Sequence, residues 1–316
     1  MNLALILKGM AMGVAEAIPG VSGGTIAFIT GIYERLLTAI GSILGPEVIG
    51  ALRREGIGAA WTKADGNFIL QLGAGMVVGI GVAVVVITEL LASYPPVVWA
   101  FFFGLIIASA VYIAKQVERW SPLAFGLLVA GAAVAFFLTT INPLAGSDNP
   151  VFVFIAGAIA ISALILPGIS GSFILLLLGM YTVVFQAVRN LATLDAGAIA
   201  IVVTFALGCL VGLALFSRLL TYTFRTYPNL TLATLTGFML GSLNKLWPWR
   251  NALTYRTNSG GQEVPVLEEA VLPGDYTMGE AFVPLVIASF LLGILIVFLL
   301  DRFGPKGDEV DVVTAK

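Results

Sequence analysis

A short segment that cannot continue a helix occurs twice in this chain. Pro19-Gly20-Val21-Ser22-Gly23-Gly24 is matched 148 residues later by Pro167-Gly168-Ile169-Ser170-Gly171-Ser172. Proline lacks a backbone donor and clashes with the preceding turn, while glycine permits turns that other residues cannot adopt. Each copy is therefore predicted to end one helix and begin another.

The spacing of further residues extends the match between two halves. At the same offset of 148, Gly31 and Tyr33 correspond to Gly179 and Tyr181. The offset then becomes 133 and relates Gly75, Gly79, Tyr94, Gly104 and Ser109 to Gly208, Gly212, Tyr227, Gly237 and Ser242. A 15-residue segment found only in the first half reconciles the offsets. It lies within 43–66 and is predicted to form an interfacial amphipathic helix at about 46–64.

The composition fits a membrane and not water, because 59% of the residues are hydrophobic and 11% are charged. Runs such as Phe68 to Ile87 and Val283 to Leu300 can span about 30 Å of hydrocarbon as helices. The N-terminal run has no small-residue cleavage site before its glycines, so we expect it to stay in the mature fold.

These features predict an all-α polytopic membrane protein made of two inverted repeats, residues 1–142 and 143–316. Each repeat has a broken helix pair, re-entrant or spanning, and three transmembrane helices. The helices expected in the first repeat are Leu3–Ile18, Gly24–Leu44, Phe68–Leu91, Val97–Lys115 and Pro122–Ile141. Those of the second are Val151–Leu166, Ser172–Leu191, Ala198–Leu220, Leu230–Leu246 and Phe282–Asp301. Each half crosses an odd number of times, so the halves must be inverted, as in many transporters.

The cations indicate the orientation in the cytoplasmic membrane. One side is rich in Lys and Arg and carries both termini, so we expect it to be cytoplasmic; its cations are Lys8, Arg35, Arg53, Arg54, Lys63, Lys115, Arg119, Arg218, Arg225, Arg302, Lys306 and Lys316. The other side has Arg189, Lys245, Arg250 and Arg256. The acidic loop at about 249–278 is expected to face outward without a fold of its own.

The two breaks form the candidate binding site, because free backbone groups within a membrane must be buried in protein or line a wet cavity. Helices that start there would aim amide donors at an anion such as phosphate or carboxylate. The candidate binding residues are Glu16, Pro19, Gly20, Ser22, Gly23, Gly24, Thr25, Pro167, Gly168, Ser170, Gly171, Ser172 and Arg218. A simple kink whose serines satisfy the backbone is the structural alternative.

Two charged candidates each have a second interpretation. Glu16 lies in an uncharged stretch and has Leu164 as its counterpart, which favours proton coupling or pairing with a cation. It could equally be a helix-end residue at the interface. Arg218 is a candidate counter-ion for phosphate or an anchor on the cytoplasmic side.

Catalysis is not expected. The chain has no histidine and one cysteine, Cys209, inside an apolar run. This argues against a metal centre, a Ser-His or Cys-His hydrolase, and a redox role. We predict no catalytic residues, no metal and no cofactor. Gly104 and Gly237 are interpreted as close-packing positions in helices.

The sequence resembles a bacterial and archaeal membrane family, catalogued as domain of unknown function 368, that is linked to polyprenyl-phosphate transport. The resemblance covers nearly the whole chain and lies in Glu16-Ala17-Ile18-Pro19-Gly20-Val21-Ser22-Gly23-Gly24-Thr25, Gly31-Ile32-Tyr33-Glu34, Leu166-Pro167-Gly168-Ile169-Ser170-Gly171-Ser172, Gly237-Phe238-Met239-Leu240-Gly241-Ser242-Leu243 and Trp247-Pro248-Trp249.

The resemblance implies a translocase that returns undecaprenyl phosphate, the carrier for peptidoglycan and other surface polymers, from the outer to the inner leaflet. The partners expected are this lipid, membrane lipids, a coupling proton or ion and a second copy of the chain, with no nucleic acid. The residues alone support an anion transporter, and an ion-coupled carrier of a small soluble anion or amino acid is the alternative. A lateral opening between helices would favour the lipid, and a closed, water-filled vestibule would favour the solute.

Overall fold

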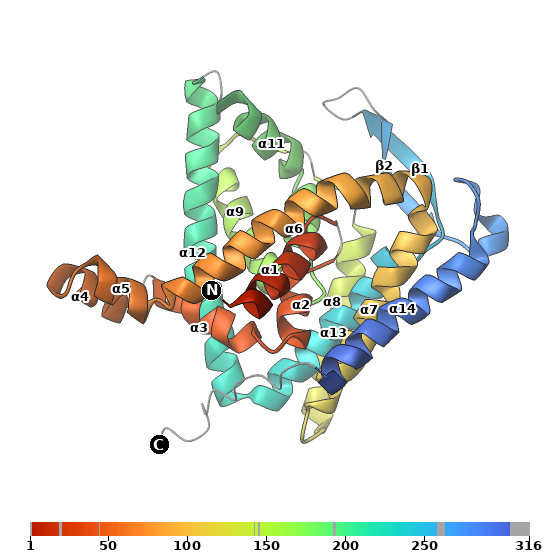
Figure 1. Cartoon of the computed structure of the whole chain (residues 1–316). Coiled ribbons are helices and arrows are strands. Elements are labelled where there is room, and N and C mark those ends of the chain that lie inside the picture. The colour runs from red at the N-terminus through yellow and green to blue at the C-terminus, as the bar shows by residue number, and fades with distance from the viewer. Residues whose placement is uncertain are drawn as a thin grey trace.

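The computed structural model describes residues 2–18, 21–43, 45–141, 143–144, 146–191, 194–257 and 263–303. These residues form fourteen α-helices and one β-hairpin (Figure 1). The first half contains α1 (Leu3–Glu16), α2 (Gly23–Ile29), α3 (Tyr33–Ile43), α4 (Pro46–Arg54), α5 (Ile57–Lys63), α6 (Gly66–Ser93), α7 (Pro95–Lys115) and α8 (Pro122–Thr140). The second contains α9 (Pro150–Ile165), α10 (Gly171–Leu177), α11 (Met180–Asn190), α12 (Ala196–Thr226), α13 (Pro228–Leu246) and α14 (Val283–Phe303). The predicted helical membrane fold is confirmed.

Five of the described helices, α6, α7, α8, α12 and α14, are long and apolar enough to cross a membrane. The count rises to 7 if the bent pairs α3 with α4 and α10 with α11 each form one span. The expected span at Leu230–Leu246 does form a helix, α13, but it is more polar. It packs against α7 and α8, and the hydroxyls of Thr231, Thr236 and Ser242 donate to carbonyls of earlier residues in the same helix.

Three predicted helices are wrong in their continuity. The helix expected at Gly24–Leu44 is divided into α2 and α3, and the one expected at Ser172–Leu191 is divided into α10 and α11. The breaks lie at Gly31 and Gly179, whose φ angles of 71° and 68° interrupt a right-handed helix. The interfacial helix expected at 46–64 is likewise two helices, α4 and α5, separated by Gly56 with a φ of 91°. These two project from one side of the bundle (Figure 1).

The loop at 249–278 does have a fold of its own, so that expectation was wrong. Strands β1 (Arg250–Thr257) and β2 (Glu263–Ala270) pair antiparallel, and a short 3-10 turn follows at Pro273–Asp275. The base of the hairpin is attached to the end of α13. Trp247 Nε1 donates to the carbonyl of Val271 at 2.8 Å, and Trp249 Nε1 donates to the carbonyl of Ala281 at 2.9 Å. Trp247 and Trp249 thus hold the base of the hairpin against the bundle.

Helix crossings recur at positions related by the two sequence offsets. Gly79 of α6 lies against the carbonyl of Met10 in α1, and Gly212 of α12 lies against Ala158 in α9. The last helix of each half packs on the other half, so that α14 lies beside α7 (Figure 1) and α8 contacts α13. A Cβ at Gly104 would lie 2.2 Å from the Phe290 carbonyl oxygen, and one at Gly237 would lie 2.1 Å from that of Leu128. The close-packing interpretation of these two glycines is confirmed.

A substitution at one crossing tests this packing. A Cβ at Gly79 would lie 2.1 Å from the Met10 carbonyl oxygen, whereas one at Gly81 on the same helix meets nothing within 4 Å. We expect Gly79→Val to lower the thermal unfolding midpoint in detergent, because forcing α1 from α6 costs about 1 to 3 kcal/mol. Gly81→Val is the matched control and should unfold near the wild-type temperature. Equal midpoints for the two variants would contradict the crossing.

Candidate functional site

The first break lies between α1 and α2. Ser22 caps α2, and its Oγ accepts a hydrogen bond from the Gly24 amide at 3.1 Å. The Gly23 amide donates to Glu16 Oε1 at 2.6 Å. Pro19 and Gly20 lie outside the described residues. The first donors of α2 therefore have partners inside the chain, where the sequence led us to expect amides directed at a ligand.

The second break connects α9 to α10 and includes Pro167. Gly168 has a φ of 85°, and a Cβ there would lie 2.6 Å from the Cα of Met239 in α13, so both conformation and space require glycine. Ser170 caps α10 by accepting a hydrogen bond from the Phe173 amide at 3.4 Å, and its hydroxyl lies 2.9 Å from that of Ser172. The break is thus closed onto α13.

The two breaks contact one another directly. The hydroxyl of Ser22 donates to the carbonyl of Leu166 at 2.9 Å. Thr25 Oγ1 accepts a hydrogen bond from the Gly168 amide at 3.2 Å. Ser22 and Thr25 are both fully buried. Polar groups that the helix breaks release are therefore satisfied across the interface between the halves, as buried backbone groups in a membrane must be.

Two further contacts close the same interface. The hydroxyl of Tyr33 in α3 donates to the carbonyl of Ile165 at 3.2 Å. A Cβ at Gly24 would lie 2.2 Å from that same carbonyl oxygen. Only a glycine at the start of α2 lets the backbone approach the end of α9 this closely. The residues around the first break therefore also contact the last residue of α9, where the second break begins.

Glu16 and the residue at the matching position of the second half, Leu164, differ in chemistry. A Cβ at Gly23 would lie 2.7 Å from Glu16 Oε1, and a Cβ at the corresponding Gly171 would lie 2.8 Å from the Cβ of Leu164. The carboxylate accepts the Gly23 amide where the second half has an aliphatic side chain. Glu16, the last residue of α1, is partly buried and is thus the acid of the first break.

Arg218 lies elsewhere in the bundle. Its Nε donates to the carbonyl of Gly41 near the end of α3 at 3.4 Å, and Gly41 also approaches Ser217. This contact joins α12 to α3. The contacts described for Arg218 do not bring it to the two breaks.

A large apolar groove borders the first break. Its volume is about 760 Å³, and it lies between the pair α1 and α6 and the pair α7 and α14. Ala15 of α1 and Ile26 of α2, on either side of the break, line it. Leu7, Leu90 and Leu285 line it and are exposed, so the groove reaches the surface of the bundle. Among the described residues that line it, Lys8 supplies a charge, and its Nζ donates to the carbonyl of Thr30 at 2.7 Å.

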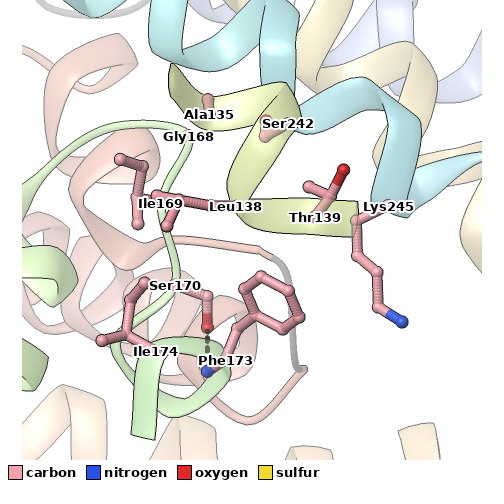
Figure 2. A pocket seen from close by; sticks show the side chains of 10 residues that line it. All are labelled: Ala135, Leu138, Thr139, Gly168, Ile169, Ser170, Phe173, Ile174, Ser242 and Lys245. Carbon is pink, nitrogen blue, oxygen red and sulfur yellow. Dashed lines mark hydrogen bonds between the residues drawn. The ribbon is translucent and has the colours of Figure 1, made fainter. Parts of the chain in front are cut away.

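A small cavity borders the second break. Figure 2 shows Ser170 and Phe173 of the break together with Thr139 at the end of α8 and Lys245 at the end of α13. The cavity has a volume of about 20 Å³, enough for one water molecule. Lys245 is not among the site residues predicted from the sequence. The sequence signal for Lys245 was its place near the end of the helix that contains the Gly237 to Leu243 motif. Its contact with the break arises because helices far apart in the chain pack together.

No group of three or more His, Cys, Asp and Glu side chains that could hold a metal ion occurs in the described part of the chain. The long apolar helices define a polytopic membrane protein, in which two helix breaks contact each other beside an apolar groove and a small cavity lined by Lys245.

The chain belongs to the undecaprenyl phosphate translocase-like family, whose model matches residues 12–264. It is 40% identical to a polyprenyl-phosphate transporter of Vibrio cholerae over 307 residues, covering 96% of this chain and 97% of the relative. It is 31% identical to a polyprenyl-phosphate transporter of Staphylococcus aureus over 255 residues, covering 77% of this chain and 85% of the relative. No solved structure matches the chain.

Proposed function

We propose that this protein returns undecaprenyl phosphate from the outer to the inner leaflet of the cytoplasmic membrane. The names of the two relatives support a polyprenyl phosphate as the substrate. The uneven distribution of Lys and Arg supports an orientation with both termini in the cytoplasm. Two inverted halves would then expose one head-group site alternately to each side.

The observation that carries the proposal is the apolar groove. Along α14 it extends from Leu285 to Leu300, roughly 22 Å at the rise of an α-helix. A hydrocarbon chain can lie along this length, with the exposed leucines of the groove in contact with the bilayer. A small soluble anion gains nothing from such a lining, because burying its charge among apolar side chains is costly. The groove therefore favours a lipid over a soluble solute.

The phosphate head group binds where the two breaks contact each other. Ala15 and Ile26 line the groove, and Glu16 and Gly23 are adjacent to the break in sequence. A phosphate that reaches this point competes with the Glu16 carboxylate for the Gly23 amide. Movement of the two halves about the contacts of Ser22, Gly24 and Thr25 would carry the head group between leaflets while the prenyl tail stays in lipid.

Filling the groove tests the function in reconstituted vesicles. Ala11 lines the groove on α1, and Ala133 is exposed on α8 outside either cavity. We expect Ala11→Trp to reduce leaflet-to-leaflet transfer of labelled polyprenyl phosphate about tenfold, because the indole occupies volume needed by the tail. Ala133→Trp is the matched control and should transport at the wild-type rate. Failure of the wild-type protein to transfer the label would refute the proposed function.

A further inference from the structure

Two cations next to the second break converge on one carboxylate of the hairpin. Lys245 Nζ lies 2.8 Å from Glu268 Oε2, and Arg250 Nε lies 3.5 Å from the same oxygen. Arg250 also donates through Nη2 to the carbonyl of Glu268 at 2.9 Å and through Nη1 to the carbonyl of Asn244 at 2.5 Å. The three side chains carry a formal excess of one positive charge.

Arg250 is not fully satisfied by this arrangement. Its side chain is 10% exposed, and the Glu268 oxygen that lies 3.5 Å from its buried Nε does not complete a hydrogen bond of good geometry. Burial lowers the pKa of the guanidinium from its ordinary value, and the nearby charge of Glu268 acts in the opposite direction. A buried N–H donor without an acceptor is costly, so the cluster has capacity for one more acceptor or a better one.

The cluster is continuous with a set of hydroxyl groups. Lys245, Ser170, Thr139 and Ser242 line the same small cavity (Figure 2). Asn244 Nδ2 donates to Thr139 Oγ1 at 2.6 Å, which connects the end of α13 to the end of α8. Cations with hydroxyl groups on neighbouring residues are the kind of groups that bind a phosphate. The cavity volume of about 20 Å³ is too small for a phosphate, so the cavity must widen when a head group binds.

We propose that Lys245 and Arg250, with the hydroxyls of Ser170 and Thr139, form a binding site for a phosphomonoester head group, and that Glu268 occupies these cations until the head group displaces it. The assignment to a lipid head group rests on the proposed function. Each break then has its own carboxylate, because Glu16 accepts the Gly23 amide at the first break and Glu268 binds the cations beside the second.

A displaceable carboxylate has a clear consequence for affinity. Removing its charge leaves the same two cations with a net charge of two instead of one, and removes the competitor at the same time. We expect Glu268→Gln to raise the affinity of the full-length protein in detergent for farnesyl phosphate about tenfold. Glu269→Gln is the matched control, since Glu269 is the next residue of β2 and is exposed. It makes the same change in net charge and should alter the affinity less than about twofold.

Three probes and two further variants define the site. Inorganic phosphate should follow the pattern of farnesyl phosphate at lower affinity, and farnesol, which lacks the anion, should bind all variants equally. Lys245→Met should weaken binding of both phosphates about tenfold. The double variant Lys245→Met with Glu268→Gln should recover only part of this loss, because Glu268→Gln then frees Arg250 alone.

The outcomes separate this inference from the proposed function. If Glu268→Gln lowers the affinity together with the thermal unfolding midpoint, Glu268 only holds Lys245 in place and the inference is refuted. An equal gain in Glu269→Gln refutes it as well. Wild-type lipid transfer that neither Lys245→Met nor Glu268→Gln alters refutes the inference and leaves the proposed function standing. If inorganic phosphate binds the variants with the expected order of affinities but farnesyl phosphate binds none of them, the anion site is supported and the lipid assignment is refuted.

Discussion

Replacing Gly24 with alanine is expected to reduce lipid transfer by at least about tenfold, a larger effect than a single methyl group usually has. The new Cβ would lie 2.2 Å from the Ile165 carbonyl oxygen, well inside the contact distance. Since the obstacle is backbone at the end of α9, no side-chain rotation can relieve it, and the two breaks must separate. The measurement is transfer of labelled polyprenyl phosphate in proteoliposomes.

The control for Gly24→Ala is Gly126→Ala in α8, where an added Cβ meets nothing within 4 Å. Ser22→Ala gives a graded second variant, because it removes the donor to Leu166 and costs about 1 kcal/mol instead of forcing the backbones apart. Protein abundance and thermal unfolding identify a folding defect. Normal folding with wild-type transfer in Gly24→Ala would show that the contact between the breaks plays no part in transport.

The parts of the fold that the sequence predicts are those with a local physical cause. The apolar runs give the long helices because the bilayer requires about 20 apolar residues for a span. Proline and glycine predict the two helix breaks, and the similarity between the two segments predicts that the breaks form one site. The glycines at matched offsets, such as Gly79 and Gly212, later prove to lie at corresponding helix crossings.

The errors have causes that only tertiary structure reveals. Gly31 and Gly179 look like ordinary glycines in apolar runs, yet each adopts a positive φ that divides a helix. The hairpin was missed because its stability comes partly from Trp247 and Trp249, which lie outside the two strands. Lys245 was missed because α13 meets α8 and the second break through packing, so no sequence spacing relates Lys245 to Ser170 or Thr139.

At the first break, Glu16→Gln is expected to keep lipid binding and to lose the dependence of transport on pH. Glutamine retains an oxygen that can accept the Gly23 amide, so the geometry of the break should survive. What changes is the charge. An ionised carboxylate and a bound phosphate repel each other, so loading of the lipid should be accompanied by uptake of a proton and release of the lipid by its loss.

Two further variants isolate the charge from the hydrogen bond. Glu16→Leu introduces the residue that the second half has at Leu164 and leaves the Gly23 amide without its acceptor, so it should also lower the thermal unfolding midpoint. Glu34→Gln removes an exposed carboxylate from the first turn of α3 and should leave the pH profile unchanged.

The decisive measurement is the rate of transfer between leaflets as a function of external pH for the wild-type protein and Glu16→Gln. With a proton gradient imposed, the wild-type rate should rise, whereas the rate of the variant should stay flat and about tenfold lower. Exchange of labelled for unlabelled lipid in the absence of a gradient should continue in the variant, because it needs the binding site and not the proton. Identical pH profiles for the two proteins would eliminate Glu16 as the coupling residue and leave it a structural acceptor for the start of α2.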